Sequence, residues 1–128
     1  MYKFSNFTAK ANEALNIAIE CAEDFGHNYI GSEHILLGIL KEGTGVGAVV
    51  LSENDIDTKT IEELIKSNTG IGSPTKLSPS YFTPQAKRIL EIAYQTASGM
   101  FHSFVGTEHL LMAILQEDDC YAVQYLQA

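Results

Sequence analysis

Residues 27–37 read His-Asn-Tyr-Ile-Gly-Ser-Glu-His-Ile-Leu-Leu, and residues 102–112 read His-Ser-Phe-Val-Gly-Thr-Glu-His-Leu-Leu-Met. Both stretches belong to a longer internal repeat, because residues 7–42 align with residues 82–117 at a constant offset of 75 and without a gap. Fifteen of these 36 aligned positions are identical. Unrelated helical segments would not share an ungapped register through a loop. The sequence therefore predicts two tandem copies of one unit.

The first segment of each copy has the three- and four-residue apolar spacing of an amphipathic helix. Thr8 and Thr83 are good N-cap residues, and Pro84 suits a first helical position, where its missing N–H is not needed. Gly26 is the expected C-terminal stop in copy one. The stripes comprise Ala11, Leu15, Ala18, Ala22 and Phe25 in copy one and Ala86, Leu90, Ala93 and Ala97 in copy two.

The second helix of each copy is expected to start at Ser32 or Thr107, which we interpret as its cap. In copy one a short third helix follows over residues 46–53, and a fourth over residues 57–67. Residues 70–81 are rich in Gly, Ser and Pro and read as a linker. We predict one all-α domain over residues 1–128, with repeat one at 7–69, the linker at 70–81 and repeat two at 82–128. Repeat two is truncated, so part of its core should be exposed.

The formal net charge of −8 argues against nucleic acid and anionic membranes as partners, since both attract basic surfaces. The longest apolar run, residues 35–40, is too short to span a bilayer, and the first residues do not resemble a signal peptide. We therefore expect a cytoplasmic, monomeric domain. Cys21 and Cys120 are interpreted as buried thiols rather than as a disulfide framework.

No Gly-x-x-x-x-Gly-Lys-[Ser/Thr] loop and no Gly-x-Ser-x-Gly elbow occurs in the sequence. We therefore predict a non-enzymatic chain without a cofactor. The histidines form two matched pairs, His27 with His34 and His102 with His109, each beside a glutamate. Two His and one Glu could bind a metal, but a loop separates the members of each pair. We favour structural histidines that hydrogen-bond loop carbonyls, and predict no metal site.

Glu33 and Glu108 stand at predicted helix starts, where a negative charge contributes about 0.3–1 kcal/mol. They could instead present a carboxylate to a guanidinium group. Thr8 and Thr83 likewise have two interpretations, either as plain N-caps or as parts of an anion site at a helix N-terminus. The residues alone do not decide between these alternatives.

The order of these motifs resembles the Clp amino-terminal repeat domain, and among such domains the ClpC type of AAA+ unfoldase. The resemblance spans nearly the whole chain and rests on residues 7–11, 26–39, 81–87 and 105–111. It implies a pseudo-twofold bundle of about eight short helices on a hexameric AAA+ ring. It also implies binding of adaptor proteins and of unfolded or phosphoarginine-marked substrates, with Glu33, Glu108, Thr8 and Thr83 forming the phosphoarginine sites.

Two further functions remain open from the sequence: a stand-alone adaptor or regulator without an ATPase, and a small metal-dependent enzyme that uses the Glu-His pairs. The two copies also depart from each other. Copy one reads Thr-Ala-Lys-Ala at residues 8–11, whereas copy two reads Thr-Pro-Gln-Ala at residues 83–86. Phe101 stands opposite Gly26. The two sites are therefore not expected to be equal in affinity.

Overall fold

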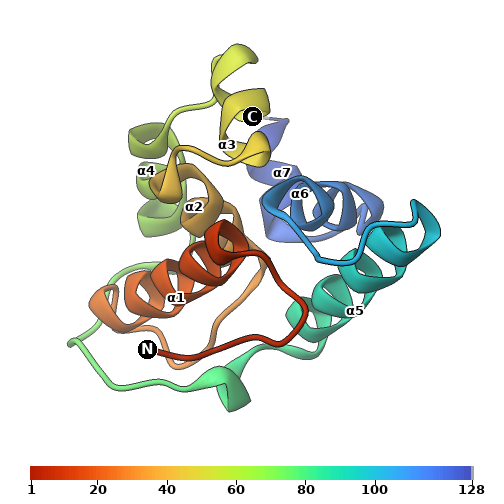
Figure 1. Ribbon diagram of the computed structural model, residues 1–128. Helices are drawn as coiled ribbons and strands as arrows, with labels where there is room; N and C mark the ends of the chain where they lie inside the picture. The colour runs from red at the N-terminus through yellow and green to blue at the C-terminus, as the bar shows by residue number, and fades with distance from the viewer. Residues whose placement is uncertain (128) are drawn as a thin grey trace.

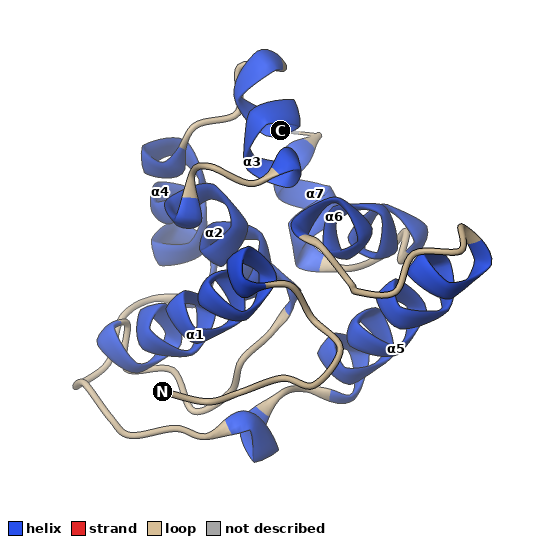
Figure 2. Ribbon diagram, viewed as in Figure 1, coloured by secondary structure: helices blue, strands red, loops and turns tan. Residues whose placement is uncertain are grey.

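The computed structural model describes residues 1–127, and within them the chain is helical without any extended sheet (Figure 1, Figure 2). The predicted all-α fold is confirmed. Residue 128, the last of the predicted repeat two, lies outside the described residues. The elements are α1 (Ala9–Asp24), α2 (Ser32–Glu42), α3 (Val46–Glu53), α4 (Thr58–Thr69), a 3-10 turn η1 (Pro79–Tyr81), α5 (Pro84–Gly99), α6 (Thr107–Gln116) and α7 (Tyr121–Leu126).

The first helix of each copy begins as the sequence predicts. The Thr8 hydroxyl accepts a hydrogen bond from the Ala11 N–H at 3.1 Å, and the Thr83 hydroxyl accepts one from the Ala86 N–H at 3.0 Å. Each bond satisfies one of the N–H groups that a helix N-terminus leaves without a partner. Pro84 occupies the first position of α5.

The predicted caps of the second helices are wrong by one residue. The N-caps of α2 and α6 are Gly31 and Gly106, and Ser32 and Thr107 are the first helical residues. The hydroxyls of Ser32 and Thr107 are engaged elsewhere, with the third helix of the opposite copy, so they do not cap their own helices.

These two hydroxyls cap helices across the molecule. The Ser32 Oγ accepts a hydrogen bond from the Ala122 N–H at the start of α7 (3.2 Å), and the Thr107 Oγ1 accepts one from the Gly47 N–H at the start of α3 (3.0 Å). The N-cap residues of α3 and α7, Gly45 and Cys120, provide no side-chain cap of their own. Each copy therefore completes a helix of the other.

The loops of the two copies are also paired with each other. The Val105 N–H donates to the Asn6 carbonyl (2.7 Å), and the Val105 carbonyl accepts from the Thr8 N–H (2.8 Å). In the mirrored arrangement, Ile30 bonds the Tyr81 carbonyl (2.9 Å) and the Thr83 N–H (3.0 Å). The segment that leads into the first helix of one copy thus lies beside the segment that leads into the second helix of the other.

The core lies between the alanine-rich faces of α1 and α5 and the leucine-rich helices α2 and α6 (Figure 1). Helices α1 and α2 approach each other closely at Gly38, because a Cβ there would lie 2.2 Å from the Ala14 carbonyl oxygen. Gly38 on α2 and the alanines Ala14 and Ala18 on α1 are small enough to allow this contact. The buried side chains of the two helices can therefore pack closely against each other. Cys21 and Cys120 are both buried free thiols, as predicted.

Repeat two has no counterpart of α4 within the described residues. Helix α4 packs against α2 and buries Ile61 and Ile65. Leu37 on α2 is fully buried, whereas Met112, its counterpart on α6, is 40% exposed. The expected exposure of the core of copy two is confirmed, while the exact boundaries of the repeats stay a prediction.

None of the single helices within residues 1–127 is long and apolar enough to cross a membrane. Helices α2 and α3 reach that length and hydropathy only when taken together, and the angle between them is 93°.

We expect Ser32→Ala to lower the free energy of unfolding by about 1–2 kcal/mol, because it leaves the Ala122 N–H buried without a partner. Thr107→Val, which keeps the volume but removes the oxygen, should cost a similar amount through Gly47. Urea denaturation measures both. Ser67→Ala on the exposed face of α4 is the matched control and should change stability by less than about 0.5 kcal/mol. Equal midpoints for all three variants would contradict the cross-copy caps.

Candidate functional site

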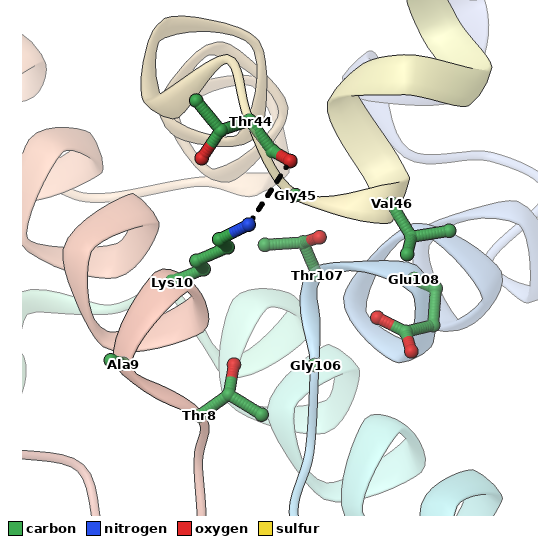
Figure 3. A pocket seen from close by; sticks show the side chains of 9 residues that line it. All are labelled: Thr8, Ala9, Lys10, Thr44, Gly45, Val46, Gly106, Thr107 and Glu108. Atoms are coloured by element: carbon green, nitrogen blue, oxygen red, sulfur yellow. Dashed lines mark hydrogen bonds between the residues drawn. The ribbon is translucent and has the colours of Figure 1, made fainter.

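The predicted site residues gather in two pockets, each built from both copies. The first pocket, of about 370 Å³, lies where α1, the start of α3 and the start of α6 meet (Figure 3). It is lined by Thr8, Ala9, Lys10, Thr44, Gly45, Val46, Gly106, Thr107 and Glu108. The second, of about 360 Å³, is lined by Tyr29, Gly31, Ser32, Glu33, Thr83, Pro84, Gln85, Arg88 and Tyr121. The structure thus groups Thr8 with Glu108, and Thr83 with Glu33.

The first pocket combines anion-binding and cation-binding groups. Beyond the Thr8 cap, the N–H groups of Ala9 and Lys10 stand at the start of α1 and have no intrahelical partner. The Lys10 ammonium is exposed and donates to the Thr44 carbonyl at 3.3 Å (Figure 3). The half-buried Glu108 supplies the negative charge across the pocket (Figure 3). One end can therefore hold an anion and the other a cation.

The glycine of the Gly-[Ser/Thr]-Glu-His motif makes room for the glutamate. A Cβ at Gly106 would lie 2.3 Å from a carboxylate oxygen of Glu108, and a Cβ at Gly31 would lie 2.4 Å from one of Glu33. Each carboxylate is therefore folded back over the first turn of its helix, where the N–H groups favour negative charge. A larger residue at either glycine would push the carboxylate away from this position.

Glu33 differs from Glu108 in its surroundings. Glu33 is 1% exposed, and its Oε2 accepts a hydrogen bond from the Tyr29 hydroxyl at 2.8 Å. Burial raises the pKa of the Glu33 carboxyl above its usual value, and the bond from Tyr29 opposes that effect. The counterpart of Tyr29 is Phe104, which has no hydroxyl and is 57% exposed. Tyr29 therefore covers the carboxylate in the second pocket, and nothing equivalent covers Glu108.

The second pocket offers fewer free groups to an anion. Pro84 has no N–H, so the first position of α5 contributes no donor. Its cation, Arg88, is already paired with Glu117. Arg88 lies on α5 and Glu117 just past the end of α6, so this ion pair holds the guanidinium within copy two. The two pockets thus differ in the N–H groups and in the unpaired cation that they present.

The histidines form two chains of hydrogen bonds. The Gly31 N–H donates to His34 Nδ1 (2.9 Å), His34 Nε2 lies 2.8 Å from His27 Nδ1, and His27 Nε2 lies 2.9 Å from the Gly70 carbonyl. Because Gly31 can only donate, His34 must carry its proton on Nε2 and donate to His27. His27 then donates to Gly70 in the linker.

The copy-two pair repeats most of this arrangement. The Gly106 N–H donates to His109 Nδ1 (2.8 Å), and His109 Nε2 lies 2.8 Å from His102 Nδ1. No group of three or more His, Cys, Asp or Glu side chains within residues 1–127 is arranged to hold a metal ion. We propose that all four histidines fix the junction between the loop and the second helix.

Sequence reasoning identified Thr8, Thr83, Glu33 and Glu108, and the comparison of residues 8–11 with residues 83–86 already showed Lys10 and Pro84 as differences between the copies. It missed Tyr29, which the same comparison could have found, since Phe104 takes its place in copy two. The crossed grouping of the sites has no signal in the sequence, because either copy could have provided either wall.

Comparisons with known proteins place this geometry in context. The model of the family described as "Clp repeat (R) N-terminal domain" matches residues 6–128. A Clp protease ATP-binding subunit, the ClpA homolog of Porphyra purpurea, is 39% identical over 124 residues, which are 97% of this chain and 15% of that protein. The chloroplastic chaperone ClpC1 of Oryza sativa is 38% identical over 125 residues, or 98% of this chain and 14% of that protein. The chain thus spans about a seventh of these curated relatives.

Solved structures share the fold at lower identity. The N-terminal domain of ClpD from Arabidopsis thaliana superposes with a TM-score of 0.77 at 23% identity, covering 98% of this chain and 86% of that one. The ClpV N-domain, solved in complex with a VipB peptide, superposes with a TM-score of 0.73 at 19% identity, covering 95% and 75%.

The buried His34 makes stability depend on pH. Burial lowers the pKa of His34 to about 3, whereas an unfolded chain titrates near 6.5. Between these values the unfolded state binds the extra proton, so stability is complete above pH 6.5 and is lost as the pH falls toward 3. We expect a loss of about 2–4 kcal/mol by pH 4. The raised pKa of Glu33 acts in the opposite direction and reduces this loss.

His34→Gln isolates the contribution of the imidazole. The variant should be less stable at pH 7.5, and the difference in unfolding free energy from the wild type should shrink as the pH falls. Chemical denaturation at several pH values measures it. A constant difference from pH 7.5 to pH 4 would show that His34 does not titrate as its burial requires.

Proposed function

Because the chain belongs to the family of Clp repeat N-terminal domains, we propose that it is a non-enzymatic module that binds substrates and adaptor proteins for a ClpC-type unfoldase. The match to the family over residues 6–128 carries this proposal. The peptide complex of the ClpV N-domain supports it, because that relative of the same fold holds a peptide. In a full-length protein, the module would deliver its ligands to an ATP-driven ring; the sequence itself has no phosphate-binding loop.

We further propose that both pockets recognise phosphoarginine, with Glu108 and Thr8 in the first and Glu33 and Thr83 in the second. Phosphoarginine joins a planar guanidino group to an anionic phosphoryl group. A carboxylate pairs with the former through two parallel hydrogen bonds, and N–H groups at a helix start accommodate the latter. The first pocket offers both groups on opposite walls, with Lys10 as an additional cation.

The first pocket is proposed as the tighter site. Its carboxylate is partly open to solvent, whereas Glu33 must first part from Tyr29. Its helix start keeps the Ala9 N–H, whereas Pro84 supplies none. Occupation of the second pocket should therefore require a higher ligand concentration.

Glu108→Ala is expected to weaken the tighter phosphoarginine binding by about 2–5 kcal/mol of binding free energy, because truncation leaves the guanidino group without its carboxylate. Calorimetric titration with free phosphoarginine measures the loss. Glu33→Ala should leave that binding unchanged and remove only the weaker event. Melting curves of the variants show whether the fold is retained. The melting temperature should change little, since a first-turn glutamate such as Glu108 contributes only about 0.3–1 kcal/mol to stability. Unchanged titrations of the double variant would end the proposal.

The hydroxyl of Tyr29, which Phe104 lacks, is expected to set the difference in phosphoarginine affinity between the two pockets. Tyr29→Phe removes the hydroxyl that occupies Glu33, so the second site should tighten by about tenfold, the equivalent of one hydrogen bond to a charged group. Phe104→Tyr adds a hydroxyl beside Glu108 and should weaken the first site. The same titrations on both single variants test this, and affinities that do not respond to either change would rule out Tyr29 as the cause of the difference.

A further inference from the structure

The first four residues run alongside α1 in the opposite direction to it and are held there by two asparagines (Figure 1). Asn12 accepts a hydrogen bond from the Phe4 N–H (2.6 Å) and donates one to the Phe4 carbonyl (3.1 Å). Asn16 makes the same two bonds with Tyr2, at 2.8 and 2.7 Å. Two side-chain amides thus satisfy all four main-chain polar groups of two alternate residues, as the edge of a β-sheet would.

The spacing explains why two asparagines can do this. Positions i and i+4 of a helix lie on one face and are separated by about 6 Å along its axis. Alternate residues of an extended chain are about 6.4–6.8 Å apart. An asparagine pair at that helical spacing therefore matches every second residue of an extended polypeptide. Copy two has Lys87 and Glu91 at the corresponding positions, so only α1 carries the pair.

Recognition is directed at the main chain rather than at side chains. Lys3 is exposed, and Tyr2 is 40% exposed and contributes a single side-chain bond, from its hydroxyl to the Leu77 carbonyl (3.2 Å). Phe4 alone packs inward, with its ring centroid 6.2 Å from those of Phe7 and Phe82. A different segment with an aromatic residue at this one position could make the same contacts.

The binding surface is built and open at one end. Asn16 is 5% exposed, so its amide is buried and would lose two bonds if the segment left without replacement. Beyond Tyr2 lies a cavity of about 220 Å³ between α1 and linker residues Lys76 and Leu77. Met1 is fully exposed, so a longer chain could continue past this point into solvent.

We propose that Asn12 and Asn16 form a groove that binds extended polypeptide through its main chain, and that residues 1–4 occupy it as an intramolecular competitor. The ligand class is an unfolded or extended protein segment with an aromatic residue, because only such a segment leaves alternate N–H and C=O groups free. The groove uses different side chains from the two pockets, so it does not depend on phosphoarginine recognition.

The test weakens the competitor within the 128-residue chain and supplies the same segment as a separate peptide. In Tyr2→Pro/Phe4→Pro, both N–H donors and the Phe4 ring are lost. The probe is a fluorescent peptide, acetyl-Met-Tyr-Lys-Phe-Ser-Gly-Ser. We expect it to bind the double variant at least about tenfold more tightly than the wild type, since a tethered segment competes at an effective concentration in the millimolar range. Phosphoarginine titrations should be the same for both proteins.

Matched peptides test the main-chain contacts. N-methylation of the Tyr and Phe amides should abolish binding, whereas N-methylation of the Lys amide should change it by less than about threefold. Asn16→Asp in the double variant keeps the acceptor but loses the donor, and should also abolish binding. Equal binding of all peptides, or none to either protein, overturns the proposal.

A second measurement covers the case in which the double variant folds poorly. In the wild type, saturating peptide should speed hydrogen exchange at the Tyr2 and Phe4 amides, because it displaces residues 1–4. Exchange rates that do not respond to the peptide also overturn the proposal.

Discussion

The reciprocal hydrogen bonds between the two copies are the constraint on which the rest of the structure depends. Ser32 and Thr107 each cap a helix of the other copy, and Ile30 and Val105 each bond the strand-like segment before the other copy's first helix. A single copy would leave these groups without their protein partners, and would expose them to water instead. Because the copies are interlocked at the starts of their helices, every pocket formed there has one wall from each.

Few side chains then make equivalent pockets unequal. Tyr29 covers Glu33, while Phe104 leaves Glu108 accessible. Pro84 removes an N–H that Ala9 provides. None of these differences disturbs the backbone arrangement that the copies share, because each acts at the surface of a pocket and not in the core. A duplicated fold can thus keep its packing while the side chains that line its two pockets diverge.

The Gly-[Ser/Thr]-Glu-His motif acts as one unit, which explains its recurrence at a distance of 75 residues. The glycine makes space for the carboxylate, the hydroxyl caps the opposite copy, and the histidine accepts the glycine N–H. Each residue type was recognisable in the sequence, and the favoured structural role of the histidines is consistent with the hydrogen bonds that His34 and His109 make. The cap was misassigned to Ser32 and Thr107, because a hydroxyl at a helix start usually bonds its own helix.

The first two helices of each copy, their order and the duplication could be predicted from the sequence, since helical periodicity, threonine caps and an ungapped repeat are local properties. It also identified Thr8, Thr83, Glu33 and Glu108 as candidates. The folded chain was needed to show that Thr8 lies with Glu108 and Thr83 with Glu33, that Tyr29 covers one carboxylate, and that Asn12 and Asn16 hold residues 1–4. The first two are contacts between segments that are far apart in the chain. The others depend on the direction in which a side chain points. Local patterns specify which elements form, but long-range packing specifies which of them meet.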